Sequence, residues 1–495
     1  MMKSFSSATV KTFFLLLLLL KQTQCSVGKL KLYEFQRKLQ QKTSNSQISA
    51  AQNYPKTIGR VFYPTGYGAD PTGAHDSSSA ILDALSDAAK VKTGVQMLPG
   101  ISDFGGVVID FQGGNFKISQ PIRFPPGIGN IVVQGGTLRA SDTFPGDRHL
   151  IELWATGSPK PSSSSPKNDA PTTFYDSKDT NRDGITYEDI TFRDILFDSS
   201  FRGGGLLVIS SARIHVTDSF FLRFTTQGII IKWGHETFIS NCFLGQHPTV
   251  GGDPGERSFG GTAIDIASTD NAVTDVVVFS AAIGIVLRGN ANIVTGVHCY
   301  NKATDFGGVG ISVQSAQNRI ISPYMDYNNI VIVDPDQVHV SNGFFLGNGS
   351  VVLKSNAGRV SGLTIVDNVF SGGSVPIVRI EGVFKRIDQV VVDRNVANGM
   401  EMRSTVAKMA VAGVNGTSWR ADFSKVLLFP NKINHVEYSF FLRPVGGIES
   451  GFGDHAVTKV SNNAVVIESR KKVNAVVSIS VDQYNMVGEK SLDLM

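Results

Sequence analysis

A short pattern that recurs along the middle of the chain constrains the fold more than any other feature of the sequence. In each copy, β-branched or aromatic residues run into a turn residue, and successive turn residues lie 20 to 34 positions apart. The turn residues are Asp194, Asp218, Asn241, Asp275, Gly296, Ser322, Asn342, Asp367 and Asp393. Strands at this spacing, with no helical periodicity between them, are typical of solenoid coils, each too small to bury its own apolar face.

Residues at fixed offsets from these turns are apolar in every copy. Two positions before the turn stand Phe192, Val216, Ile239, Val273, Val294, Ile320, Val340, Ile365 and Val391. Three positions after it stand Phe197, Phe221, Leu244, Val278, Cys299, Met325, Phe345, Phe370 and Val396. Such columns are expected where stacked coils point equivalent side chains into one core. The sequence therefore predicts an all-β fold, a right-handed parallel β-helix.

A column of amides supports this prediction. Asn271, Asn292 and Asn318 each stand four residues before the turn of their coil. Because neighbouring coils are about 4.8 Å apart, stacked amides can hydrogen-bond along a ladder. A β-sandwich of regular hairpins is the alternative, but among the nine turns only Asn342-Gly343 has the dipeptide that hairpins favour.

Both ends of a solenoid need caps, and the sequence supplies a candidate for each. Asp76 and three serines precede a helical pattern that continues to Ala89, which predicts an N-capped helix of three turns over the first coil. A weaker helix is predicted at about Lys29 to Gln41. Residues 417–485 alternate between apolar and polar positions, which predicts a small β-sheet cap at the C-terminal end.

The first 25 residues are typical of a secretory signal peptide. Lys3 and Lys11 precede an eight-residue apolar run, Phe13 to Leu20. Spanning a bilayer takes about 20 apolar residues, which disfavours the alternative of an anchoring helix. We therefore expect a secreted, extracellular protein that is not held in a membrane. The expected organisation is a signal peptide (1–25), an N-terminal segment (26–57), the β-helix (58–400) and the β-rich cap (401–495), with residues 157–183 as an exposed loop.

Charge and cysteine content narrow the function classes. Removing residues 1–25 deletes three lysines and no acids, so the formal net charge falls from +4 to +1. A chain this close to neutrality does not bind nucleic acid by bulk charge, and an acidic polymer would have to be held by local cations. The two cysteines left, Cys242 and Cys299, are too few for a disulfide scaffold, and we expect buried thiols. Asn348 and Asn415 begin glycosylation sequons.

Two stretches carry a resemblance to a known family. Gly66-Tyr67-Gly68-Ala69-Asp70-Pro71-Thr72-Gly73 resembles the opening of pectate-lyase-superfamily proteins, and Gly308 to Ser315 is similar to the Gly-His-Gly-Ile-Ser-Ile-Gly-Ser stretch of polygalacturonases. From about residue 58 onward the chain looks most like the quartet-type plant polygalacturonases, relatives of glycoside hydrolase family 28. The resemblance implies a secreted monomeric β-helix that acts in the plant cell wall around developing pollen. It also implies hydrolysis of pectin (homogalacturonan) by an inverting pair of carboxylates, without a cofactor.

The usual catalytic residues of polygalacturonases are absent from the matching strands. Those enzymes carry Asn-Thr-Asp, then Asp-Asp one coil later, then the His of the Gly-His-Gly stretch. Here the matching positions hold Gly260-Gly261-Thr262, then Ala282-Ile283, then Val309. A catalytic site in this chain must therefore use other residues.

The β-helix pattern supplies other candidates. Aligning coils on the asparagine ladder predicts that Asp265, Val286 and Ser312 face outward in one row, with Ala267, Arg288 and Gln314 beside them. We predict Asp265, Asp270 and Asp305 as catalytic carboxylates, since glycoside hydrolysis needs a protonated acid and a carboxylate that activates water. We predict Arg288, His298 and Arg257 as substrate contacts, because a guanidinium can hold a uronate carboxylate in a fork. The alternatives are a turn role for Asp270, a structural ion pair between Asp265 and Arg288, and a core role for His298.

Two other functions stay open on the sequence alone. A pectate lyase would bind Ca²⁺ through clustered acids, and no tight cluster of three acids falls on successive coils. Asp179 to Gly184 looks like the start of a calcium loop, but Ile190 stands at the twelfth position, where a carboxylate belongs. We therefore expect no metal. The non-enzyme alternative is a β-helix that binds a wall polysaccharide without cutting it.

Overall fold

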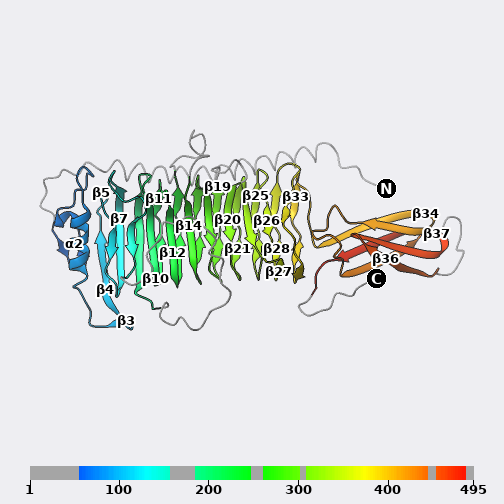
Figure 1. Ribbon diagram of the computed structural model, residues 1–495, viewed down its shortest axis with the longest axis horizontal. Helices are drawn as coiled ribbons and strands as arrows, with labels where there is room; N and C mark the ends of the chain where they lie inside the picture. Colours follow the sequence, from blue (N-terminus) through cyan, green and yellow to red (C-terminus); the bar gives the residue numbers. More distant parts are fainter. Residues whose placement is uncertain (1–54, 156–183, 247–259, 301–307, 444–452, 486–495) are drawn as a thin grey trace.

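Parallel strands stacked coil upon coil make up most of the molecule, and they form a right-handed β-helix (Figure 1). The computed structural model describes residues 55–155, 184–246, 260–300, 308–443 and 453–485. The predicted signal peptide, the predicted helix at Lys29–Gln41 and the predicted loop at 157–183 lie outside these residues. Among the described residues, no helix is both long and apolar enough to cross a bilayer.

Each coil contributes to three sheets, and β10 and β12 bend from the first sheet into the second. The first sheet contains β6 (Ile122–Phe124), β8 (His149–Leu153), β10 (Gly204–Thr217), β12 (Gln227–Ser240), β14 (Thr262–Thr269), β17 (Ile283–Leu287), β20 (Gly308–Val313), β23 (Asn328–Val333), β26 (Val351–Lys354) and β30 (Val378–Glu381). The second adds β2 (Val61–Phe62), β4 (Ile101–Asp110), β7 (Ile128–Ala140), β9 (Tyr187–Asp198), β15 (Ala272–Thr274), β18 (Ile293–Thr295), β21 (Arg319–Ile321), β24 (His339–Ser341), β28 (Thr364–Val366) and β32 (Val391–Asp393).

The third sheet lies on the remaining side of the helix. It begins with β5 (Asn115–Ile118) and the ends of β7 and β9. It continues with β11 (Phe220–Leu222), β13 (Phe243–Gly245), β16 (Val277–Phe279), β19 (His298–Tyr300), β22 (Tyr324–Asp326), β25 (Phe344–Leu346), β29 (Val369–Ser371) and β33 (Val396–Asn398). Two short strands, β27 (Arg359–Ser361) and β31 (Arg386–Asp388), pair separately. β1 (Thr57–Ile58) and β3 (Gln96–Leu98) add antiparallel edges to β2 and β4.

The two apolar columns stack in register, as predicted, through the first eight copies. For example, Val273 pairs with Val294 and Val278 pairs with Cys299, and all of these side chains are buried. The turn residues share a left-handed backbone conformation, with φ between 49° and 64° from Asp194 to Asp367. Asp and Asn tolerate this region better than other residues with a side chain, which explains why they dominate the column.

The last copy is shifted by one residue from the prediction. Val392, not Val391, pairs with Ile365 and is buried, and Ala397, not Val396, follows Phe370 in the second column. Val396 is 56% exposed. The left-handed turn residue in this coil is Arg394 (φ 52°) instead of Asp393.

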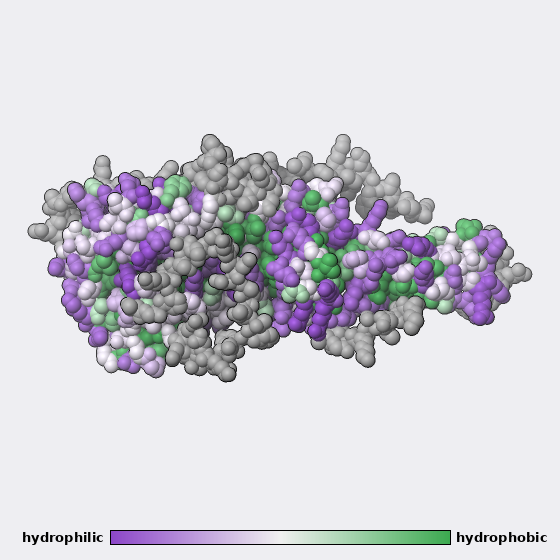
Figure 2. Space-filling model, viewed as in Figure 1, coloured by the Kyte–Doolittle hydropathy of each residue, from purple (hydrophilic) through white to green (hydrophobic). Residues whose placement is uncertain are grey.

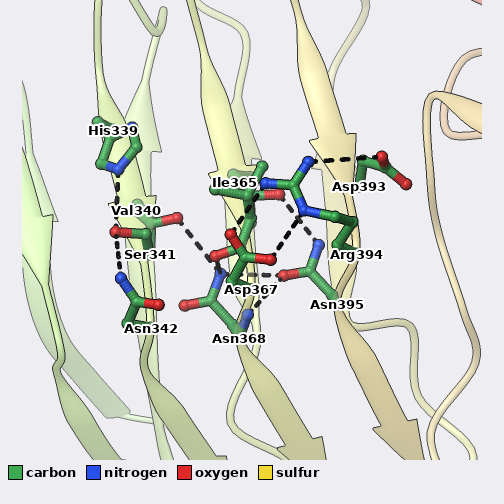
Figure 3. A network of polar contacts seen from close by, with 11 residues as sticks. His339, Val340, Ser341, Asn342, Ile365, Asp367, Asn368, Asp393, Arg394 and Asn395 are labelled. Atoms are coloured by element: carbon green, nitrogen blue, oxygen red, sulfur yellow. Dashed lines mark hydrogen bonds and ion pairs between the residues drawn. The ribbon is translucent and has the colours of Figure 1, made fainter.

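Contacts around Arg394 explain the shift (Figure 3). Its guanidinium donates two hydrogen bonds of 2.9 Å to the carboxylate of Asp367, the turn residue one coil earlier. The following residue, Asn395, accepts hydrogen bonds from the backbone N–H and the amide of Asn368, both at 3.0 Å. This second amide ladder sets the register of the last coil. The preference of aspartate for turns alone would have made Asp393 the turn residue.

The predicted asparagine ladder is confirmed. Asn271, Asn292 and Asn318 are all buried. Asn292 Oδ1 accepts from the backbone N–H of Asn271 at 3.0 Å and from its amide at 2.8 Å, and Asn318 Oδ1 accepts from the N–H of Asn292 at 3.0 Å. Cys242 and Cys299 are buried free thiols, as expected. Burial raises the pKa of each thiol to about 12.

Both caps are present. Helix α2 (Ser78–Ala88), preceded by the short 3₁₀ helix η1 (Pro64–Tyr67), covers the first coil with Ala80, Ile81 and Leu85. Asp76 Oδ1 accepts from the backbone N–H of Ser78 at 3.3 Å and from its hydroxyl at 2.7 Å. At the other end, Leu428 and Phe429 join the β-helix core.

Beyond them stands an antiparallel sheet of β34 (Val406–Asp422), β35 (His435–Leu442), β36 (His455–Ser461) and β37 (Ala464–Asp482). It has a core of its own around Trp419, and it projects from the end of the β-helix (Figure 1).

Candidate functional site

The outward surface of the first sheet carries the predicted row. Asp265 on β14 pairs with Val286 on β17, which pairs with Ser312 on β20. Inward neighbours fix this orientation, because Ile264, Ile285 and Ile311 belong to the core of the β-helix and strand side chains alternate. Arg288 and Gln314 follow directly after β17 and β20. The sequence therefore placed these side chains correctly.

Asp265 and Arg288 form a bidentate ion pair. Arg288 Nε lies 2.9 Å from Asp265 Oδ1, and Nη2 lies 3.3 Å from Oδ2. Nη1 donates to Gln314 Oε1 at 2.7 Å, and the Gln314 amide donates to the Ser312 hydroxyl at 3.2 Å. The Asp265 side chain is 9% exposed and that of Arg288 is 34% exposed. One guanidinium is thus held by a carboxylate and an amide while part of it faces outward.

The other predicted site residues do not join this group. Asp270 is an exposed turn residue between β14 and β15, with φ 58°, and its carbonyl accepts the backbone N–H of Glu236 at 2.9 Å. His298 lies on β19 in the third sheet, with its ring 4.1 Å from that of Tyr324. Asp305 and Arg257 lie outside the described residues. Asn348 and Asn415 are exposed.

The row that matches the usual polygalacturonase acids is now defined by register. Thr262 pairs with Ile283, and Ile283 pairs with Val309, on β14, β17 and β20. The three positions are therefore neighbours on one surface, next to the Asp265 row. They carry one hydroxyl and two hydrocarbon side chains, which cannot exchange a proton with a glycosidic oxygen.

A second charged cluster, missed by sequence reasoning, lies nearer the N-terminal end of the same sheet. Glu152 on β8 is completely buried. It accepts from Arg148 Nε at 2.8 Å, from a second Arg148 nitrogen, from Trp154 Nε1 at 2.8 Å and from the backbone N–H of His149 at 3.1 Å. The Arg123 guanidinium lies 3.4 Å from the centre of the Trp154 ring. The sequence contained one indication of this cluster. Side chains alternate along the strand His149–Trp154, so Glu152 and Trp154 face outward together.

The electrostatics of this cluster favour a fixed structural unit. Burial raises the pKa of the Glu152 carboxyl, but hydrogen bonds from Arg148, Trp154 and His149 outweigh it and hold that pKa below its usual range. Burial lowers the pKa of the adjacent His149 imidazole to about 4. Glu152 therefore carries its charge while sealed from solvent by its own hydrogen-bond donors.

Glu152 and Asp265 are too far apart to act on one bond. They occupy the same outward row, with Leu207 and Ile230 on the two strands between them. Three strand spacings make about 14 Å. The carboxylates of an inverting glycosidase stand roughly 6.5–9.5 Å apart. The intervening Leu207, Ile209 and Ile230 form a buried apolar ridge against Trp154 and Trp233, which separates the two charged clusters.

Comparison with known proteins gives the family. The chain is 48% identical over 434 residues to polygalacturonase QRT3 of Arabidopsis thaliana, covering 86% of this chain and 84% of that protein. The chain belongs to this polygalacturonase family. The resemblance to quartet-type polygalacturonases is thereby confirmed. No family model matches.

A solved structure shows the same kind of architecture at low sequence identity. The ORF18 protein of Geobacillus virus E2 matches 84% of this polygalacturonase-family chain and 77% of its own, with a TM-score of 0.50 and 9% identity. The endo-xylogalacturonan hydrolase of Aspergillus tubingensis matches over 69% of this chain and 95% of its own, with a TM-score of 0.45 and 13% identity. At 9% identity the likeness to the viral protein concerns the fold alone.

Proposed function

We propose that this protein is a secreted polygalacturonase that hydrolyses the α-1,4-galacturonosyl bonds of pectin in the plant cell wall. The observation that carries the proposal is the 48% identity, over most of both chains, to a protein named a polygalacturonase. Asn348 and Asn415, the asparagines of the two sequons, are exposed, which fits passage through the secretory pathway. The substrate is a polyanion, and no cofactor enters the proposed reaction.

Arg288 is the proposed contact for a galacturonate carboxylate. One hydrogen on each of Nε, Nη1 and Nη2 is donated to Asp265 or Gln314. A guanidinium has five N–H donors, so donors remain on its exposed part for a second carboxylate. The fixed Asp265 and Gln314 contacts hold the plane of the guanidinium, which reduces the entropy lost on binding.

Asp265 is the proposed carboxylate that activates water. A carboxylate has about four acceptor sites, so Asp265 can accept a proton from an attacking water molecule while Arg288 occupies part of it. The general acid needs a second carboxyl group on the far side of the bond. Asp305 stays our predicted partner for that role.

A non-catalytic wall-binding protein is the second candidate, and one observation favours it. The neighbouring positions Thr262, Ile283 and Val309 hold neither acid nor histidine, and Asp265 is engaged by Arg288. Under this proposal, Arg288 would bind galacturonate without cleavage.

An assay on polygalacturonate separates these functions. A hydrolase releases reducing ends, a lyase releases reducing ends together with an unsaturated product, and a binding protein does neither. If Asp265 is catalytic, Asp265→Asn should abolish release while Asp367→Asn should not. Asp367 forms the same bidentate pair with Arg394 in the turn between the second and third sheets, so it controls for the loss of an Asp–Arg pair. Full activity in Asp265→Asn would remove Asp265 from the site and make Asp305 the first candidate.

A further inference from the structure

The C-terminal sheet contains a pocket of about 240 Å³, beyond the last coil of the β-helix. Its lining comes from the end of β35, the start of β36 and the bulged middle of β37, and includes Phe440, Phe441, Leu442, His455, Ser469 and Val473. The Asp265 site lies on β14 of the first sheet, so the two sites are on different structural units. Figure 2 shows hydrophobic and hydrophilic patches side by side on this projecting sheet.

Two stacked rings form one wall of the pocket. The His455 imidazole lies 4.3 Å from the Phe440 ring with an angle of 6° between their planes. The Tyr438 hydroxyl lies 3.0 Å from His455 Nδ1, which fixes the imidazole. The ring of Trp419 lies 5.0 Å from that of Phe440, with an angle of 81° between their planes. Phe441 is 57% exposed and Leu442 is 42% exposed. The pocket therefore has a preformed, partly apolar surface with polar edges, as small-ligand sites do.

A basic rim, defined here as Arg470-Lys471-Lys472, connects two residues that line the pocket, Ser469 and Val473. All three of its residues are exposed. Ser469 Oγ donates to the Lys471 carbonyl at 3.0 Å, which holds this bulge in shape. The backbone N–H of Arg443 donates to Asn474 O at 2.7 Å and brings a fourth basic residue to the same end. Asp454 pairs with Arg470 at 3.2 Å, but both side chains are at least 75% exposed, so the pair is weak.

We propose that this pocket binds an acidic saccharide, a uronate unit of a wall polysaccharide. The C–H face of a pyranose ring is apolar and fits against His455 and Phe441, which line the pocket and are exposed, while its carboxylate is attracted by Lys471 and Lys472 of the rim. Charge complementarity selects this ligand over a neutral sugar, which would gain nothing from the basic rim. The pocket extends the proposed function by giving the protein a second hold on one polymer, which raises the effective concentration of substrate at the β-helix.

Affinity electrophoresis of the full-length protein in gels that contain polygalacturonate tests the proposal. Lys471→Gln/Lys472→Gln should weaken retention about ten-fold, the effect of losing two exposed charge pairs. Lys408→Gln/Lys425→Gln is the control, because it removes the same charge from exposed residues outside the basic rim. His455→Ala should also weaken retention, and circular dichroism checks its fold. Added salt should reduce the difference between wild type and the Lys471→Gln/Lys472→Gln variant.

Cleavage measured on a short oligogalacturonate keeps this inference separate from the proposed function. Unchanged cleavage with weaker retention supports the pocket, and pocket-dependent retention without any cleavage supports it while refuting the proposed hydrolase. Equal retention of the pocket variant and its control overturns the inference, as does equal retention by fully methyl-esterified pectin, which lacks the carboxylates. Loss of self-association in His455→Ala, with polymer retention intact, would also overturn it and assign the pocket to a second copy of the chain.

Discussion

Asn292→Ala perturbs the centre of the first amide ladder and should lower stability more than any surface change in the same coil. The Asn292 amide donates to Gly289 O at 2.7 Å and to Ser268 O at 3.2 Å, while its oxygen accepts both hydrogen bonds from Asn271. The side chain is completely buried. Its removal therefore affects four hydrogen bonds where no solvent can replace them.

Not all of these losses cost the same. The Asn271 amide keeps its contacts with Ser268 Oγ and Thr269 O, and Gly289 O keeps the hydroxyl of Ser315. The backbone N–H of Asn271 loses the acceptor shown for it, and Ser268 O loses a donor. One orphaned buried N–H costs about 1–3 kcal/mol, and the small cavity adds to it, so we expect a loss of about 2–4 kcal/mol.

Asn290→Ala is the matched control. Asn290 belongs to the same coil but is exposed, and its Oδ1 accepts one backbone N–H, from Ala316 at 3.2 Å. Its loss should cost less than about 1 kcal/mol because water can take over the contact. Urea unfolding of the two variants, followed by circular dichroism, gives the comparison. If Asn292→Ala unfolds at the same urea concentration as Asn290→Ala, the buried ladder does not stabilise the fold as we infer.

Three further predictions concern the first sheet and its turns. Arg288→Lys should weaken binding of oligogalacturonate even though the charge is kept, because lysine cannot form the two parallel hydrogen bonds; unchanged affinity in a calorimetric titration would rule out recognition by Arg288. His149→Gln should remove part of the acid sensitivity of folding. The folded-state pKa of His149, about 4, is below its ordinary 6.5, so between these values the unfolded chain binds the proton and the folded chain does not. Stability is therefore lost as pH falls from 6.5 to 4, by up to about 3 kcal/mol, and unfolding midpoints of wild type and variant should converge at low pH if this holds. Asp270→Ala should leave the rate of reducing-end release unchanged, since the structure places Asp270 in a turn; a large loss of activity would return it to the site.

The fold was predictable because each coil repeats the same physical demand. In each coil an apolar, mostly β-branched residue faces inward. The residue two positions later adopts a left-handed conformation that Asp and Asn accept. The prediction was wrong by one residue in the last coil, where Val391 and Val392 suit an inward position equally. What decides there is the hydrogen bond of Asn395 to Asn368, together with the pair of Arg394 and Asp367. Those contacts involve a neighbouring coil and are invisible in the local pattern.

The positions of the candidate site residues could be predicted only where the register between neighbouring strands determines them. Asp265 and Arg288 could be placed together because their inward neighbours Ile264 and Leu287 belong to stacked columns. His298 lies in the row of Val277 and Tyr324 on the third sheet, beside the inward Cys299. The spacing of the repeat did not indicate how far this row lies from Asp265. The Glu152 cluster was not predicted because its hydrogen-bond donors are Arg148 and Trp154. Their contact with Glu152 depends on the path of the chain just before and just after β8.

The bidentate pairs Asp265–Arg288 and Asp367–Arg394 differ in a way that bears on the proposed function. In the pair of Asp367 and Arg394 the side chains are 43% and 61% exposed, so water screens the charges and the pair costs little to form. In the pair of Asp265 and Arg288 they are 9% and 34% exposed, and removing these charges from water is expensive. The neighbours of Asp265 in its row, Ile230 and Val286, show that apolar residues fit this surface. Stability alone therefore gives no reason for a charged pair at this place, whereas the recognition of a uronate carboxylate that we propose for Arg288 does.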